Sequence, residues 1–407
     1  MKKKWKKQVD AAQAAKYEAK LTEIAGLLFE EAKKMDGPSL MGGKSGAALF
    51  FFYYGKYTMK EKYVDYGLEL LSDIFDEINE GFVYHTFAGG LAGIGWTVEH
   101  LSRVEFLDAD TNEILGDLDS FLDRMMRAEI KEGNYDFLHA ALGVGFYFLS
   151  RLNCPDAKGY LSALVDGLDK VSHKDEGGGI KWHSVLDHEK KLEGFNLSLS
   201  HGISSIIAIL SRIYKQGINK EKTFFLLEGA VNYLLQQAQD LEKYSAVFPS
   251  WIAEPRIFGS RLGWCYGDLG NAITLWQAAQ IAKNKEWEEM AVKTILHSTK
   301  RRDPANEYIN DAGLCHGAIG VGHLYNRMYH YTGLEECRET ALYWYENIFK
   351  LAVNEDGLAG YKTFRIKELG GPHPDSGFLE GISGIGLALI SLLSDIEPQW
   401  DEALLMS

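Results

Sequence analysis

The stretch Gly263-Trp264-Cys265-Tyr266-Gly267-Asp268-Leu269-Gly270 has a counterpart at Gly313-Leu314-Cys315-His316-Gly317-Ala318-Ile319-Gly320. In both stretches a cysteine stands two residues before a glycine, and a second glycine follows three residues later. Cys265 and Cys315 therefore hold the same position in two copies of one pattern, roughly 50 residues apart. Self-similarity at such a period is typical of a repeat architecture.

Further copies of the glycine pattern occur along the chain, without the cysteine. They lie at residues 41–46, 88–95, 139–145, 200–205 and 380–386. In the third copy Ala140 replaces the first glycine, and in the fourth Ser205 replaces the second. Together with the two cysteine copies, these make about seven repeats at spacings of roughly 45–65 residues.

Each copy leads into a short, nearly all-apolar helix, and a longer amphipathic helix follows it. The amphipathic helices are predicted at about 59–80, 108–130, 156–172, 219–243, 284–301 and 335–353. A helix that is apolar all round must be buried on all sides, and glycines near its start let neighbouring helices approach closely. We therefore expect the apolar helices to form an inner layer that the amphipathic helices cover.

The two ends of the chain predict that the array closes on itself. A helix over residues 8–35 has no apolar partner before it, whereas the last apolar helix, about 382–394, has almost no chain left to cover it. An open solenoid needs polar caps at both ends, and the first and last repeats do not look like caps. The predicted fold is all-α, an α/α toroid of about seven inner and seven outer helices forming a single domain over residues 1–407.

One segment departs from the helical pattern. Residues 171–196 contain Gly177-Gly178-Gly179 and alternating side chains, which predict a small β-hairpin insertion.

The composition disfavours several classes of protein. A net charge of −14 leaves no basic face for nucleic acid, and no apolar run is long enough to span a membrane. The lysine run at 2–7 precedes a polar stretch, so it is predicted to be a solvated helix start and not a signal peptide. Four cysteines in a large chain without a secretory signal favour free thiols or metal ligands, and a cytoplasmic location.

Equivalent positions of neighbouring repeats should converge at one rim of a toroid. Cys265, Cys315 and His316 would then meet, and two thiolates with one imidazole suit zinc with a fourth position left open. The alternative is two buried small apolar side chains and a hydrogen-bonded histidine. Cys154 and Cys337 are predicted to be ordinary thiols on outer helices.

Other polar side chains fall near the same rim. The four that form a candidate active site are Asp136, His201, Arg261 and Tyr266. Each also has a structural interpretation, such as a helix N-cap for Asp136, a solvated loop charge for Arg261 or a core aromatic for Tyr266. Three more residues, His139, His323 and Glu380, also lie near inner helices. His139 and Glu380 share the rim position of His201, so the repeat pattern does not exclude them.

The residues that surround these positions resemble one family. The pair Trp264-Cys265-Tyr266-Gly267 and Cys315-His316-Gly317 is similar to the paired zinc motifs of the LanC-like lanthionine synthetase cyclases. Further similar segments, which place the resemblance over about 41–386, are Tyr135-Asp136, Asn196-Leu197 through His201-Gly202, Arg261 and Phe378 to Gly384. The resemblance implies a seven-fold α/α toroid and zinc held by Cys265, Cys315 and His316.

The family reaction adds a peptide cysteine thiol to dehydroalanine or dehydrobutyrine and forms a thioether ring. The resemblance implies that His201, oriented by Asp136, protonates the α-carbon, and that Arg261 or Tyr266 stabilises the enolate. It also implies a dehydrated precursor peptide as partner, with dehydration by a separate protein. Ala140 and Ser205 depart from the glycine pattern in the repeats that hold Asp136 and His201.

Three alternatives stay open at this point. The chain could add glutathione to a dehydrated residue, or it could be a zinc-binding scaffold without turnover. A prenyltransferase or glycosidase of the α/α-barrel type is more distant, since glycosidases need a pair of carboxylates across the cavity and do not explain the two cysteine motifs.

Overall fold

The computed structural model describes residues 4–187 and 189–407. The chain divides into two compact units. The first unit contains the residues up to Tyr84 together with Arg302–Ser407, and the second contains His85–Arg301. Each unit is built of the same two kinds of helix, the glycine-led helices that follow a copy of the glycine pattern and the covering helices that pack on them.

Three glycine-led helices and three covering helices make up the first unit. The glycine-led helices are α2 (Lys44–Thr58), α12 (Ala318–Thr332) and α14 (Ile382–Leu393). The covering helices are α1 (Ala11–Glu31), α3 (Glu61–Asn79) and α13 (Glu335–Leu351). Short 3₁₀ turns lie at Ala32–Lys34, Lys367–Leu369 and Gln399–Leu404.

The second unit contains four helices of each kind. Its glycine-led helices are α4 (Leu91–Arg103), α6 (Ala141–Ser150), α8 (Ile203–Lys215) and α10 (Asp268–Ala282). Its covering helices are α5 (Thr111–Lys131), α7 (Ala157–Lys170), α9 (Lys220–Gln236) and α11 (Lys285–Ser298). The described chain thus holds seven helices of each kind, in strict alternation, as the sequence predicts.

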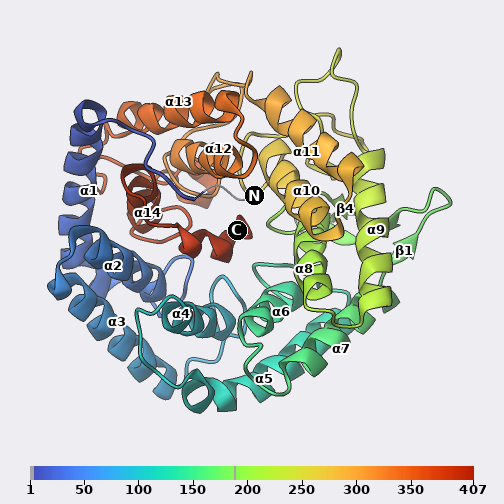
Figure 1. Ribbon diagram of the computed structural model, residues 1–407, viewed down its shortest axis with the longest axis horizontal. Coiled ribbons are helices and arrows are strands. Elements are labelled where there is room, and N and C mark those ends of the chain that lie inside the picture. The colour runs from blue at the N-terminus through green and yellow to red at the C-terminus, as the bar shows by residue number, and fades with distance from the viewer. Residues whose placement is uncertain (1–3, 188) are drawn as a thin grey trace. The chain divides into compact units, whose positions relative to one another are not determined.

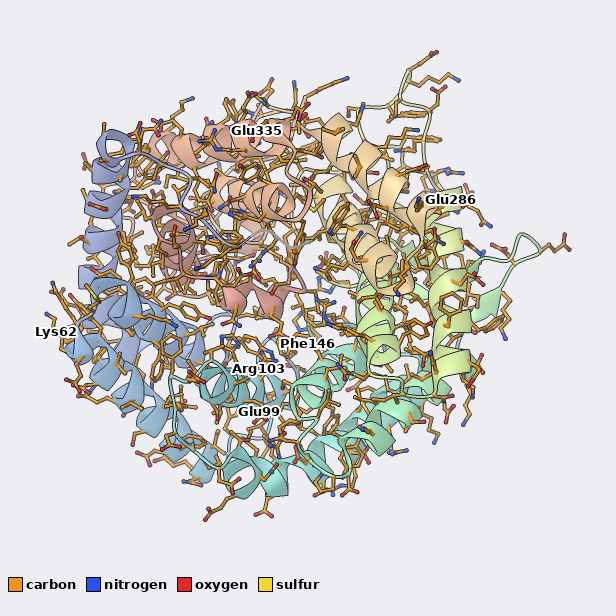
Figure 2. The ribbon with its side chains drawn as sticks, in the orientation of Figure 1. Lys62, Glu99, Arg103, Phe146, Glu286 and Glu335 are labelled. Atoms are coloured by element: carbon orange, nitrogen blue, oxygen red, sulfur yellow. The ribbon has the colours of Figure 1, made fainter. Side chains whose placement is uncertain are left out.

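Burial separates the two kinds of helix. Every residue of α14 is buried, whereas α3 buries mainly one stripe of its surface. Lys62 of α3 and Glu286 of α11 lie on exposed faces of covering helices, and Phe146 of α6 lies in the core (Figure 2). Apolar burial on all sides of the glycine-led helices is the main stabilising contribution to this architecture.

The first and last repeats pack together, as predicted from the chain ends. Helix α1 lies along α14, and both belong to the first unit (Figure 1). Their close approach depends on Gly386, because a Cβ at that position would lie 3.3 Å from Ile24 Cγ2 and 2.3 Å from Phe50 Cε2. The N-terminal helix therefore covers the last apolar helix.

Backbone hydrogen bonds tie the glycine loops of neighbouring repeats together inside each unit. In every case the acceptor is the carbonyl two residues before the glycine position of the next repeat. The bonds are Ala88 N to Leu138 O, Leu199 N to Cys265 O, Cys315 N to Leu379 O and Leu379 N to Met41 O, at 2.8–3.0 Å. The last of these bonds joins the seventh repeat to the first in the same way as the others join consecutive repeats.

The glycine positions differ in what they require. Gly267 has φ +100°, and a Cβ there would lie 2.0 Å from the carbonyl oxygen of Arg261, so only glycine fits. Ala140 takes the corresponding place in the third repeat with φ −149°, outside the left-handed region that favours glycine. The third loop therefore does not need a glycine for a positive φ at this position.

The β insertion consists of short antiparallel strands. Strand β1 (His173–Lys174) pairs with β2 (Ile180–Lys181), and β3 (Ser184–Asp187) pairs with β4 (Leu192–Asn196), which also pairs with β5 (Trp251–Ile252). The predicted hairpin at 171–196 is thus two small hairpins, the second extended by a strand from the loop before α10.

Some boundaries differ from the predictions. The helix predicted at 219–243 ends at Gln236, because the following backbone turns back and Gln239 N donates to Val247 O at 2.8 Å. Cys154 lies in the turn between α6 and α7 and not on an outer helix, whereas Cys337 lies on α13 as expected. Burial raises the pKa of the Cys337 thiol to about 12.

The solvated helix start predicted for the lysine run is wrong within the described residues. Asp10 caps α1 by accepting a hydrogen bond from Gln13 N at 2.8 Å, so residues 4–9 stay outside the helix. Trp5 is 1% exposed and donates from Nε1 to Ser391 O at 2.8 Å. Lys2 and Lys3 lie outside the described residues. No described helix has the length and apolar character needed to cross a membrane.

Candidate active site

The residue directly before the glycine position is polar or aromatic in several repeats. We call this place the pre-glycine position. In the second unit it holds His139, His201 and Tyr266 in successive repeats. Their rings are neighbours, with centroids 5.7 Å apart for His139 and His201 and 6.2 Å apart for His201 and Tyr266. The repeat geometry therefore gathers side chains that are more than 60 residues apart in sequence.

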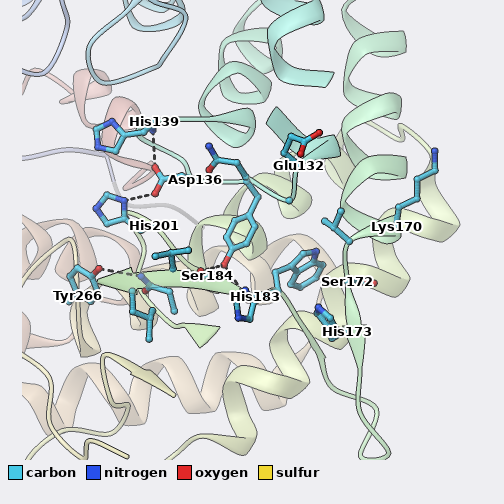
Figure 3. Close-up of a pocket in the computed structure, with 18 residues that line it drawn as sticks. Glu132, Asp136, His139, Lys170, Ser172, His173, His183, Ser184, His201 and Tyr266 are labelled. Carbon is cyan, nitrogen blue, oxygen red and sulfur yellow. Dashed lines mark hydrogen bonds and ion pairs between the residues drawn. The ribbon is translucent and has the colours of Figure 1, made fainter. Parts of the chain in front are cut away.

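Asp136 and His201 form the central pair of this site. His201 Nδ1 lies 2.6 Å from Asp136 Oδ2 (Figure 3). Burial alone would lower the pKa of His201, but the hydrogen bond and negative charge of Asp136, with a smaller effect of Cys265, raise it above its ordinary value. Burial alone would raise the pKa of Asp136, but His201 and His139 hold it below its ordinary value. The pair is therefore a carboxylate beside an imidazole whose protonated form it stabilises.

His139 completes the surroundings of Asp136. Its backbone N–H donates to Asp136 Oδ1 at 2.8 Å, and its side chain is exposed (Figure 3). Its ring lies within 17° of parallel to that of His201. Partial desolvation of the imidazole by its neighbours, with the charge of His201, lowers the pKa of His139 below its ordinary value in spite of Asp136. Helix α6 has Ala140 as its N-cap, so Asp136 is not a helix cap. One of its oxygens binds the backbone of the turn before the helix, and the other lies beside His201.

Tyr266 lies on the other side of His201. Its hydroxyl accepts a hydrogen bond from Asn196 Nδ2 at 3.2 Å (Figure 3). Burial raises the pKa of Tyr266, and the nearby Cys265 thiol adds to the shift. A neutral phenol with its oxygen facing a polar cavity can donate a hydrogen bond to an oxyanion.

An open cavity of about 810 Å³ lies within the second unit, and Asp136, His139, His201 and Tyr266 line it (Figure 3). The β insertion forms another part of the wall, where Tyr135 Oη bonds Ser184 Oγ and His183 is exposed. None of these wall residues in the β insertion was predicted to belong to the site. The sequence pattern of the insertion is weak, because strands of two to five residues have little periodicity.

The other predicted ligands also stand beside glycine positions. Cys265 belongs to the second unit and is 5% exposed. Cys315 and His316 belong to the first unit, where Cys315 is 8% exposed. None of the four cysteines, all of which lie in the described residues, forms a disulfide. His316 Nε2 lies 3.7 Å from Asp311 Oδ2.

Asp311 is a polar residue that the sequence analysis missed. It is 3% exposed and accepts backbone hydrogen bonds from Gly313 N at 3.1 Å and Phe364 N at 3.0 Å. Asp375 holds the same place in the seventh repeat and accepts from Gly377 N at 2.6 Å. The signal in the sequence is an aspartate two residues before a glycine in both repeats, six residues before the glycine position.

The remaining candidates differ in their surroundings. Arg261 is half-buried in the loop before α10 and does not belong to the cavity lining. Glu380 holds the pre-glycine position of the seventh repeat, and burial raises its pKa. His323 is fully buried within α12 and bonds Asp401 Oδ2 at 2.8 Å, in a cluster with Arg327. His323 is therefore a core residue.

The family follows from a sequence comparison. The model of the lanthionine synthetase C-like protein family matches residues 34–405. This chain belongs to the lanthionine synthetase C-like family. None of the curated protein sequences compared with it matches.

One solved structure shows the same fold, and two others are only distantly similar. Nisin cyclase superposes with a TM-score of 0.76 at 18% identity, over 96% of this chain and 97% of that protein. A sugar epimerase from a ruminal bacterium, with 10% identity and 94% and 98% coverage, gives 0.45. An unsaturated glucuronyl hydrolase from Streptococcus agalactiae, with 13% identity and 76% and 82% coverage, gives 0.44. The likeness to nisin cyclase confirms the predicted fold class, an all-α protein of the α/α-toroid class with a small β insertion.

The donor set of this family member fits zinc. Two buried cysteine thiols outside any disulfide and an imidazole are soft to borderline ligands, and such ligands bind zinc in preference to harder divalent cations such as Mg²⁺. Each of the three residues lies in a loop held by backbone hydrogen bonds, such as the one from Leu199 N to Cys265 O at 3.0 Å. Ligands on fixed loops lose little conformational freedom when they bind a metal.

Proposed function

We propose that this member of the lanthionine synthetase C-like family is a zinc-dependent lanthipeptide cyclase. In the proposed reaction, the thiol of a peptide cysteine adds to dehydroalanine or dehydrobutyrine of the same peptide. A carbon–sulfur bond forms at the β-carbon, and the α-carbon gains a proton. The observation that carries the proposal is the Asp136–His201 pair on the wall of an open cavity, in a chain whose family model spans nearly all its length.

Cys265, Cys315 and His316 are the proposed zinc ligands. They are the residues of the two paired motifs, and they hold matched places beside glycine positions of the fifth and sixth repeats. Bound zinc would lower the pKa of a substrate thiol, which otherwise titrates near ~8.5 and is mostly protonated at neutral pH. Both cysteines must stay reduced to serve as ligands, so a cytoplasmic location belongs to the same proposal.

His201 is the proposed acid. Asp136 keeps its imidazole protonated and oriented through Nδ1, so Nε2 can deliver a proton to the α-carbon of the adduct. The proton lost by the attacking thiol restores the imidazolium, and the reaction consumes no net proton. Asp136 is a positioning residue, since its carboxylate acts through His201.

Tyr266 and Arg261 are proposed to stabilise the enolate oxygen that forms when sulfur attacks. The Tyr266 hydroxyl is at the cavity wall and stays neutral because burial raises its pKa. Arg261 supplies positive charge six residues before the glycine of the same loop. The proposed substrate is a dehydrated precursor peptide, and a separate dehydratase is its proposed source.

The first test measures thiol loss. The purified chain is incubated with a dehydrated peptide that contains one cysteine, and free thiol is titrated over time. We expect thiol loss that requires zinc, and a rate about 10²–10⁴-fold lower for His201→Ala, the range for loss of a general acid. Equal thiol loss with and without zinc would contradict the mechanism. A mass increase only when glutathione is added would instead identify a glutathione transferase reaction.

The second test addresses the ligands by metal analysis. Wild-type chain should purify with about one zinc, and Cys315→Ala should lose most of it, since a thiolate is removed from the site. Cys154→Ala is the matched control, because Cys154 is a free thiol outside the proposed ligand set. Full zinc content in Cys315→Ala would sink the ligand assignment.

A further inference from the structure

Three side chains on the cavity wall are arranged as metal ligands without any sulfur. Asp136, His139 and His201 each offer one ligand atom, and these atoms all lie within 4.8 Å of one another. All three belong to the second unit. Figure 3 shows the two imidazoles side by side, with Asp136 next to both. The mechanism proposed above uses Asp136 and His201 but assigns nothing to the His139 side chain.

The arrangement is close to what a divalent cation needs. Ligand atoms around a tetrahedral zinc at 2.0–2.2 Å lie roughly 3.4 Å apart. His201 Nδ1 and Asp136 Oδ2 are already 2.6 Å apart, so only a small movement separates them. A ring nitrogen of His139 lies within 4.8 Å of both of these ligand atoms, and the His139 backbone is fixed by its bond to Asp136 Oδ1.

The chemical state of the ligands also suits a cation. Burial lowers the pKa of His139, so its imidazole is neutral and has a lone pair to donate at neutral pH. Asp136 is ionised. His201 would release one proton as the metal enters, which is the usual exchange at a histidine ligand. Two imidazoles and a carboxylate form a set that zinc, cobalt and related transition metals accept.

We propose that Asp136, His139 and His201 form a second divalent-metal site, which binds zinc or cobalt and is inhibitory. The metal would occupy the imidazole and the carboxylate to which proton delivery is assigned, so its binding and catalysis exclude each other. The open cavity leaves the remaining coordination positions to water. Binding itself depends only on these three residues, whereas the inhibition rests on the proposed function.

The test of binding uses Co²⁺ added to metal-free protein. Cobalt held by thiolates gives an intense near-ultraviolet charge-transfer band, and cobalt held by nitrogen and oxygen does not. We expect two equivalents in the wild type, one with the band and one without it. His139→Ala should weaken the equivalent without the band at least tenfold, the scale on which metal sites lose affinity when a supporting group is removed. Cys315→Ala should lose the band and keep the other equivalent.

His183→Ala is the matched control, since His183 is an exposed histidine on the same cavity wall outside the triad. It should keep both equivalents at wild-type affinity. A single equivalent in the wild type that carries the band, or unchanged binding of the equivalent without the band in His139→Ala, would overturn the second site. Loss of the band in the wild type would instead count against the sulfur ligands, so the two failures are distinguishable.

The test of inhibition follows the cyclisation rate as zinc is raised above one equivalent. Wild type and His183→Ala should lose activity at the same zinc concentration. His139→Ala should need at least roughly tenfold more zinc for the same fractional loss, relative to its own rate at one equivalent. Equal zinc sensitivity in all three proteins would reject an inhibitory role for this site.

Discussion

At the scale of single residues, the contact with Asp136 controls the pKa of His201, the proposed acid. The Asp136 carboxylate is what raises the pKa of His201 against the effect of burial. In Asp136→Asn the opposing effect of burial dominates, so the pKa of His201 falls. As the pH rises, His201 then loses its proton at a lower pH than in the wild type. We expect the alkaline limb of the pH–rate profile to move to lower pH, while the activity near the acidic limb changes less.

The matched control is Glu132→Gln, which removes an exposed carboxylate from the same cavity lining. Its profile should keep the wild-type alkaline limb. If the alkaline limb did not move in Asp136→Asn, His201 would not be the group that titrates there. If it moved equally in Glu132→Gln, the effect of Asp136 would be that of any nearby negative charge and not of its contact with His201.

Some contacts between single residues of the site could be predicted from the sequence, and others could not. Because repeat position fixes spatial neighbours, His201 and Tyr266 could be placed beside each other from their spacing before a glycine. The bond between Asp136 and His139 N could not be predicted, since it depends on how the third loop turns. The role of Asp311 could not be predicted for the same reason. Its hydrogen bonds with the backbone of Gly313 and Phe364 depend on loop conformation and not on periodicity.

At the scale of elements, helix α1 gives a direct test of how the array is covered. Ile24 is fully buried on α1 and lies against Gly386 of α14. Ile24→Ala removes buried apolar volume that its neighbours cannot refill, which costs about 2–5 kcal/mol of unfolding free energy. Glu30→Ala on the exposed face of the same helix should stay within about 0.5 kcal/mol. Urea unfolding followed by circular dichroism measures both, and equal values would deny that α1 covers the last apolar helix.

Elements were predictable where one physical signal dominated. Apolar residues at helical spacing set the covering helices to within a few residues, as for α3 and α13. The exceptions have local causes. Asp10 caps α1 after the lysine run, and Trp5 within the run is buried beside Ser391. A contact between residues so far apart in sequence cannot be predicted from the local pattern of the chain.

At the scale of the whole molecule, the glycine repeat is what makes the fold readable from sequence. Seven copies predicted seven glycine-led and seven covering helices, and the described chain has both. The likeness to nisin cyclase at 18% identity shows that the fold persists when most side chains differ. The single-domain prediction over 1–407 stays a prediction, and so do the roles of the site residues.

The last prediction concerns the stability of the whole chain with and without metal. A ligand that binds the folded chain and not the unfolded one stabilises it by about 2.7 kcal/mol at a free concentration of 100 Kd. Removing zinc with a chelator should therefore lower the midpoint of thermal unfolding. Cys154→Ala should show the same loss, because its thiol is outside the proposed ligands, whereas Cys315→Ala should unfold at a midpoint that chelation no longer changes. If chelation lowered the midpoint of Cys315→Ala as much as that of the wild type, the stabilising metal would be bound elsewhere than at Cys315.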